Sequence, residues 1–164
     1  MKLMLSVGIV LTIALTVRAD EGSRFRAGLL GANEVPSNFT AASGTFDASV
    51  VNNDTMIQFT LTYENLSGPP LAAHIHIAER NVSGGVSVFL CGGGGQPPCP
   101  PTTSGTVAGT ARAANVTGPV AQGIAPGDFA AALHMIRLGL GYANMHTSKF
   151  PAGEMRGQLK VTGN

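Results

Sequence analysis

The chain has 164 residues, with 10 Lys and Arg against 9 Asp and Glu, so its formal net charge is +1 and only 12% of its residues are charged. A chain of this length forms about one domain, and its 44% hydrophobic residues are sufficient for a core. The near-zero net charge excludes the basic surface that is typical of nucleic-acid-binding proteins, and the apolar fraction excludes an intrinsically disordered chain.

The first residues predict a secretory signal peptide. Lys2 supplies a positive charge, an apolar run extends from Leu3 to Val17, and Val17 and Ala19 occupy the two positions that a signal peptidase inspects. The apolar run is short for a membrane span. We therefore expect cleavage after residue 19, which leaves a secreted, extracellular protein without a membrane segment. An uncleaved anchor helix is the alternative.

Alternation of apolar and polar residues predicts β-strands along most of the remaining chain. Ile57, Phe59, Leu61 and Tyr63 alternate with polar residues, which is typical of a strand with one buried face. Similar strand-like runs, separated by Asn, Gly and Pro, cover residues 24–29, 45–50, 72–78, 86–90, 105–111, 141–147 and 154–162.

One segment differs from this pattern. Asp128 stands where a helix N-cap is expected, and Phe129, Leu133 and Ile136 follow at the spacing of one helical face. We therefore predict an all-β fold, a Greek-key β-sandwich of seven to nine strands with one short helix near residues 128–138.

The two cysteines, Cys91 and Cys99, enclose a short loop of Gly, Gln and Pro. In the oxidising compartment that the signal peptide implies, they are expected to form a disulfide that closes this loop. A metal site built from two cysteines is the alternative.

The sequence also contains five Asn-x-Ser/Thr sequons, at Asn38, Asn53, Asn65, Asn81 and Asn115. Chance would give roughly one or two, and these five fall in the predicted breaks between strands, so we expect N-glycosylation. The alternative is that Asn, Ser and Thr simply cluster in turns.

Polar side chains gather on the opposite face of three predicted strands. If Ile75 and Ile77 face the core, His74 and His76 project together on the other side of the same strand. The same parity places further polar residues outward on the last two strands, namely Asn144, His146, Glu154, Arg156 and Gln158. If the three strands are neighbours, these residues form one polar patch.

Four motifs are similar to those of a known family. They are Leu30-Gly-Ala-Asn-Glu-Val-Pro36, Ala73-His-Ile-His76, Gly141-Tyr-Ala-Asn-Met-His-Thr147 and Phe150-Pro-Ala-Gly-Glu-Met-Arg-Gly-Gln-Leu159. Through them residues 24–162 resemble the CHRD domain, named after repeats in chordin. The resemblance implies an immunoglobulin-like or superoxide-dismutase-like sandwich that is usually secreted, and it implies no settled activity. Ser37 and Ala152 depart from the family pattern without affecting a histidine.

Two functions compete for the polar patch. In the first, His74, His76 and His146 bind copper or zinc, since imidazole nitrogens suit both metals and His-x-His supplies two ligands from one strand. Asn144 or Glu154 would orient a ligand. The competing structural interpretation is a hydrogen-bonded network that fixes the strands, with Arg156 paired to Glu34 or Glu154.

The second function is an extracellular binding or structural module, in which the patch recognises a protein or a glycan. We take this non-enzymatic role as the default and expect no catalytic residue. Superoxide-dismutase-like activity is disfavoured because the only other histidine, His134, lies on the predicted helix. Glu34 and Glu154 are more simply explained by a turn and a salt bridge than by an acid/base pair.

Overall fold

The computed structural model describes residues 24–163, so the predicted signal peptide lies outside the described residues. They form nine β-strands, one α-helix and three short 3-10 helices, which confirms the all-β fold with a single short α-helix. The strands are β1 (Arg24–Leu30), β2 (Ser43–Val51), β3 (Met56–Glu64), β4 (Pro70–Ile77), β5 (Gly85–Cys91), β6 (Gly105–Ala111), β7 (Gly141–Thr147), β8 (Met155–Gln158) and β9 (Lys160–Gly163). The helices are α1 (Phe129–Arg137), η1 (Gly31–Asn33), η2 (Ala113–Asn115) and η3 (Val120–Gln122).

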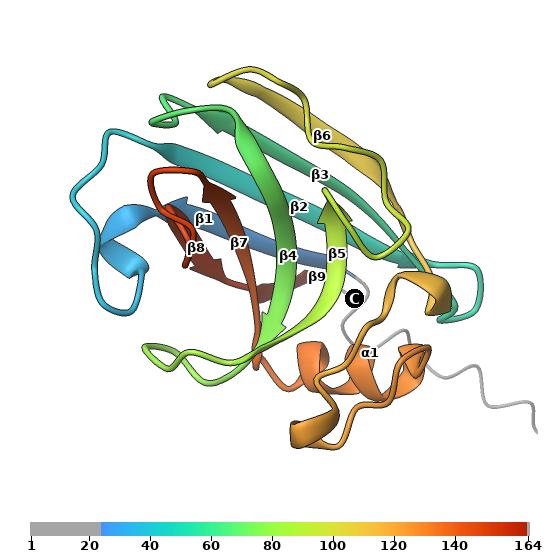
Figure 1. Cartoon of the computed structure of the whole chain (residues 1–164). Coiled ribbons are helices and arrows are strands. Elements are labelled where there is room, and N and C mark those ends of the chain that lie inside the picture. The colour runs from blue at the N-terminus through green and yellow to red at the C-terminus, as the bar shows by residue number, and fades with distance from the viewer. Residues whose placement is uncertain (1–23, 164) are drawn as a thin grey trace, which may run out of the picture.

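The strands belong to one antiparallel sheet in the order β5-β4-β7-β8-β1-β2-β3-β6, with β9 paired to β1. This sheet curls into a nearly closed barrel (Figure 1), in which the edge strands β5 and β6 approach each other without a hydrogen-bonded ladder. The last predicted strand, residues 154–162, is divided into β8 and β9 at Leu159, whose amide bonds to the carbonyl of Gly141.

The core fills the inside of the curled sheet. Strands β1, β2 and β3 alternate between buried and exposed side chains as the sequence predicts, and Phe46 and Phe59 stack across β2 and β3. Helix α1 lies near one end of the barrel (Figure 1) and buries Phe129, Leu133 and Ile136. Its predicted N-cap is confirmed, because the Asp128 carboxylate accepts a hydrogen bond from the amide of Ala131 at 3.0 Å.

Strands β4, β7 and β8 are different, because they are buried on both faces. Their outer face bears the predicted polar residues, but loops from residues 31–42, 78–84 and 148–154 bond to those residues and cover them. The parity of the strands is therefore as predicted. The expected open patch is instead a polar layer between the sheet and its loops.

The predicted disulfide is confirmed: Cys91 and Cys99 are bonded, with their Cα atoms 5.0 Å apart. The loop that they close extends from the end of β5 toward the other sheet edge. There the Gln96 side chain donates a hydrogen bond of 2.9 Å to the carbonyl of Thr110 in β6, and the Asn115 side chain donates to the carbonyl of Gly94.

One close backbone approach joins β8 to β1. A Cβ atom added to Gly157 would collide with the carbonyl of Gly28, whereas a Cβ atom added to Gly28 would meet open space. Only glycine at position 157 therefore allows β8 to lie this close to β1, and β8 carries Arg156 of the polar layer.

We therefore expect Gly157→Ala to lower the free energy of unfolding by about 1–3 kcal/mol, because β8 must move away from β1. Gly28→Ala is the matched control and should change it by less than about 0.5 kcal/mol. Chemical denaturation of the three proteins measures the difference. Coincident unfolding curves for both variants would contradict the assigned contact.

Candidate functional site

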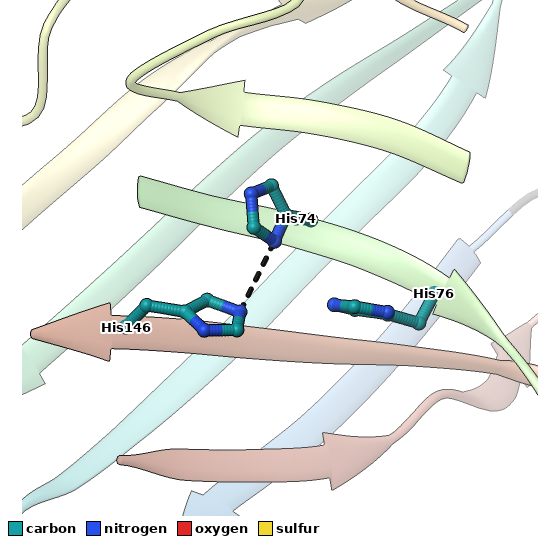
Figure 2. Close-up of side chains that lie close together, drawn as sticks. All are labelled: His74, His76 and His146. Atoms are coloured by element: carbon teal, nitrogen blue, oxygen red, sulfur yellow. Dashed lines mark hydrogen bonds between the residues drawn. The ribbon is translucent and has the colours of Figure 1, made fainter. Parts of the chain in front are cut away.

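The register of β4 and β7 brings three histidines together. His74 lies opposite Asn144, His76 opposite Tyr142, and Ala72 opposite His146, so the three imidazoles occupy adjacent positions on the outer face. The side chains of His74, His76 and His146 point toward one another (Figure 2). We refer to these three residues as the histidine cluster.

The cluster is compact and nearly closed to solvent. His74 and His76 are 7% exposed and His146 is 9% exposed. Nδ1 of His74 lies 3.1 Å from Nε2 of His146, and one ring nitrogen from each histidine lies within 4.8 Å of the others. Two nitrogens bound to one copper or zinc ion at about 2.0 Å lie about 3.3 Å apart in tetrahedral geometry, so a small closing movement gives coordination distances.

Backbone carbonyls determine which nitrogens face the centre of the cluster. Nδ1 of His76 lies 3.0 Å from the carbonyl oxygen of Gly84, and Nδ1 of His146 lies 3.1 Å from that of Pro151. A carbonyl oxygen only accepts, so both Nδ1 atoms carry the proton and both Nε2 atoms carry a lone pair. Metal-binding histidines usually have such a partner on the nitrogen that does not bind the metal.

The ring nitrogens of the cluster are not equally satisfied. Nε2 of His146 accepts from Nδ1 of His74, but Nε2 of His76 is buried and has no hydrogen-bond partner among residues 24–163. An unpaired buried acceptor costs about 1–3 kcal/mol, so native structures rarely keep one without a reason. The three residues therefore fit a metal ion: the Nε2 lone pair of His76 is free, and transfer of the His74 proton from Nδ1 to Nε2 would free Nδ1 of His74 and Nε2 of His146 as two further ligands.

Aromatic side chains enclose the cluster. The Phe89 ring packs edge-on against His74, and the Tyr142 ring stacks on His76 with the ring centroids 4.8 Å apart and the planes at 5°. The guanidinium of Arg156 lies over the Tyr142 ring, 4.3 Å from its centroid. A continuous stack therefore runs from the Arg156 cation through Tyr142 to the imidazole of His76.

Burial keeps the histidines neutral. It lowers the pKa of His74 to about 3, with further lowering by His146 and His76, and it lowers the pKa of His76 to about 4 despite the hydrogen bond to Gly84. Burial also lowers the pKa of His146. The unfolded chain binds protons more readily, so protonation below about pH 6.5 favours unfolding, and at neutral pH the lone pairs are available.

Neither Asn144 nor Glu154 orients a histidine, in contrast to the expectation from sequence. Asn144 donates to Glu34 at 2.6 Å and to the carbonyl of Met155 at 2.9 Å. The orienting groups are the backbone carbonyls of Gly84 and Pro151, which no side-chain pattern could reveal.

Glu154 instead holds three segments together. Its carboxylate accepts hydrogen bonds from the side chains of Thr40, Ser67 and Thr147 and from the amide of Ser67. Burial would raise the pKa of Glu154, but these hydrogen bonds together lower it. Apart from Glu154, the members of this network differ from those that the sequence suggested, because Thr40, Ser67 and Thr147 take the place of Arg156 and the histidines.

Arg156 is not paired with either glutamate among residues 24–163. It donates to the carbonyl of Val82 at 3.1 Å and stacks on Tyr142. Its charge still favours ionisation of Glu34, but burial dominates and raises the pKa of Glu34 to about 7. The sequence-based pairing was therefore wrong, because the guanidinium is turned toward the aromatic stack.

The remaining candidate residues lie apart from the cluster. His134 is exposed on α1, and Cys91 and Cys99 are oxidised. Asn53, Asn65 and Asn81 are exposed in turns with positive φ. Asn38 and Asn115 are half-buried, and their side-chain amides donate to the carbonyls of Gly153 and Gly94.

Comparison with known proteins assigns the family. The family model described as the CHRD domain matches residues 25–159, nearly the whole described chain. The chain belongs to the CHRD domain family. No curated protein and no solved structure matches it. The three histidines lie within the matched residues, so the cluster is part of the CHRD domain itself.

The raised pKa of Glu34 predicts a measurable pH dependence of stability. The folded CHRD domain binds the Glu34 proton more tightly than the unfolded chain does. The contribution of Glu34 to the free energy of unfolding is therefore fully present below about pH 4.5 and is lost as the pH rises toward 7. Glu34→Gln keeps the acceptor for Asn144 and removes the ionisation. The free energy of unfolding of the variant, relative to that of the wild type, should therefore increase by about 2–3 kcal/mol as the pH rises from 4.5 to 8.

Urea denaturation at a series of pH values measures this difference. The histidines titrate equally in both proteins, so their contribution cancels. Glu79→Gln, at an exposed position, is the control and should parallel the wild type at every pH. A constant difference between Glu34→Gln and the wild type would contradict the prediction.

Proposed function

We propose that this CHRD domain is a secreted protein that binds one copper or zinc ion between His74, His76 and His146. The observation that carries the proposal is the buried, unpaired Nε2 of His76, which faces the same centre as the carbonyl-oriented Nε2 of His146. An ion bound there would complete the coordination of both nitrogens and replace the His74–His146 hydrogen bond.

A purely structural role explains the cluster less well. The neighbouring Glu154 network shows what a structural network looks like in this domain, since both oxygens of the carboxylate are hydrogen-bonded. The histidine cluster is also buried, but it leaves one acceptor unpaired among the residues that the structure describes. Within residues 24–163 a single N–H, that of His74, faces this centre, so it satisfies Nε2 of His146 and leaves Nε2 of His76 without a donor.

The cluster is also too deeply buried to be a good recognition site for a protein or a glycan. Tyr142 is 3% exposed and Arg156 is 4% exposed, as little as the histidines. A protein or glycan could contact these residues only if the covering loops moved away. A single ion requires no such opening, so burial favours a metal site over the patch-like recognition surface expected from sequence.

Secretion is supported by several features that agree. The Cys91–Cys99 disulfide is typical of an oxidising compartment, and CHRD domains occur in extracellular proteins. The first residues carry the sequence pattern of a signal peptide. Among residues 24–163, no helix has the length and hydrophobicity needed to cross a membrane.

The structure separates the five sequons into two groups. Asn53, Asn65 and Asn81 have room for a glycan, whereas a glycan at Asn38 or Asn115 would disturb a half-buried side chain that bonds to a carbonyl. Mass spectrometry after glycosidase treatment of the protein secreted by eukaryotic cells should find glycans at the first three sites. Occupancy confined to Asn38 and Asn115 would contradict this assignment.

Elemental analysis tests the metal site. The purified mature protein, loaded with Cu or Zn and freed of excess ion, should retain about one equivalent. His76→Ala should lose it, since it removes the unpaired ligand. His134→Ala removes an exposed histidine and should retain the ion. Circular dichroism establishes that each variant is folded. A wild-type protein that retains neither metal would overturn the proposal.

A further inference from the structure

We infer that the histidine cluster selects monovalent copper, Cu⁺, over Zn²⁺. This inference rests on the proposed function and names the ion that the site prefers. It is carried by the number of ligands that the cluster offers and by the charge that surrounds them.

The first argument is the number of ligands. Among residues 24–163, His74, His76 and His146 are the only group of three or more His, Cys, Asp or Glu side chains that converges as a metal site does, and no carboxylate or thiolate joins it. Structural Zn²⁺ sites are almost always four-coordinate, so Zn²⁺ would need a water as its fourth ligand. Phe89, Tyr142 and the covering loops close the cluster to solvent. Cu⁺ is satisfied by two or three nitrogens.

The second argument is charge. All three ligands are neutral, so a bound ion keeps its full charge, and the cost of burying an ion rises roughly with the square of its charge. A divalent ion is therefore about four times more costly to bury than a monovalent one in the same cavity. Carboxylate or thiolate ligands, which commonly offset this cost for Zn²⁺, are absent from the cluster within residues 24–163.

The third argument is the Arg156–Tyr142–His76 stack. The guanidinium of Arg156 lies on the Tyr142 ring, and the Tyr142 ring stacks on the His76 ring. No carboxylate forms an ion pair with Arg156 among residues 24–163. The nearby Glu34 carboxylate bonds to Asn144, and burial raises its pKa to about 7, so at neutral pH its charge offsets that of Arg156 only in part. The positive charge of Arg156 therefore acts on an ion bound in the cluster, and it repels a divalent ion twice as strongly as a monovalent one.

Competition measurements test the inference on the full mature protein. Under anaerobic conditions with ascorbate, Cu⁺ is titrated against the chromophoric chelator bicinchoninate, and Zn²⁺ is titrated against 4-(2-pyridylazo)resorcinol. We expect the Kd for Cu⁺ to be at least about 100-fold lower than the Kd for Zn²⁺. Zn²⁺ that binds as tightly as Cu⁺, or more tightly, would overturn the inference and leave the metal-binding proposal standing. Failure of both ions to bind would overturn both.

Variants of Arg156 test the role of charge. Arg156→Gln removes the cation and should improve Zn²⁺ affinity relative to Cu⁺ affinity by about tenfold. Arg156→Lys keeps the charge and should retain the wild-type ratio of affinities. Arg26→Gln removes an exposed arginine that pairs with Asp47 on another strand and should also retain it.

The measured quantity is the ratio of the Cu⁺ and Zn²⁺ affinities of one protein sample. Partial unfolding lowers both affinities together, so it cannot produce the expected change in this ratio. Thermal unfolding of each metal-free variant is recorded in parallel. An unchanged ratio in folded Arg156→Gln would overturn the assignment of selectivity to the stack.

Discussion

In the antiparallel pairing of β4 with β7, Ile75 lies opposite Ala143 in the core layer, and His76 lies opposite Tyr142 on the other side. This register controls the position of the histidines, because a shift of one residue would turn every side chain of β4 to the opposite face. The hydrophobic requirement for Ile75 and Ile77 to be buried therefore also places His74 and His76 beside His146. The packing of the core therefore fixes the positions of the histidines.

The outer face of this part of the sheet carries two neighbouring polar networks with different properties. In one, Glu154 joins three segments through hydrogen bonds that satisfy its carboxylate. In the other, the carbonyls of Gly84 and Pro151 orient the imidazoles, but within the described part of the chain Nε2 of His76 has no partner. The first network holds Glu154 to Thr147 at the base of the 148–154 loop, and this loop supplies the Pro151 carbonyl that orients His146. The Gly84 carbonyl that orients His76 comes from a different loop.

Much of this arrangement was predictable from local sequence patterns. Alternation in residues 57–63 gave the strand and its buried face, Asp128 gave the start of the helix, and the His-x-His spacing gave two side chains on one face. The loops were not predictable in the same way, because their path depends on tertiary hydrogen bonds such as that from Asn38 to the carbonyl of Gly153. Sequence therefore placed the histidines on the correct face but could not show that the face is covered.

The charged residues illustrate the same limit. Sequence suggested that Arg156 would pair with a glutamate, since opposite charges on neighbouring strands usually attract each other. The structure places its guanidinium over the ring of Tyr142. The alternation of apolar and polar residues alone could not distinguish Tyr142 from an ordinary core aromatic residue. Contacts of this kind depend on the stacking of two side chains from different strands and on the loop carbonyl of Val82. None of these leaves a local signal in the sequence.

The loop closed by Cys91 and Cys99 has a consequence for the exposed end of the sheet. Strand β6 is an edge strand, and edge strands offer free carbonyls and amides to strands of other molecules. The Gln96 side chain occupies the carbonyl of Thr110 on that edge, and the disulfide restricts the loop so that it stays there. At this position the edge carbonyl is therefore not open to a strand of another molecule, and the disulfide that fixes the loop helps to protect the edge of a protein with few charges.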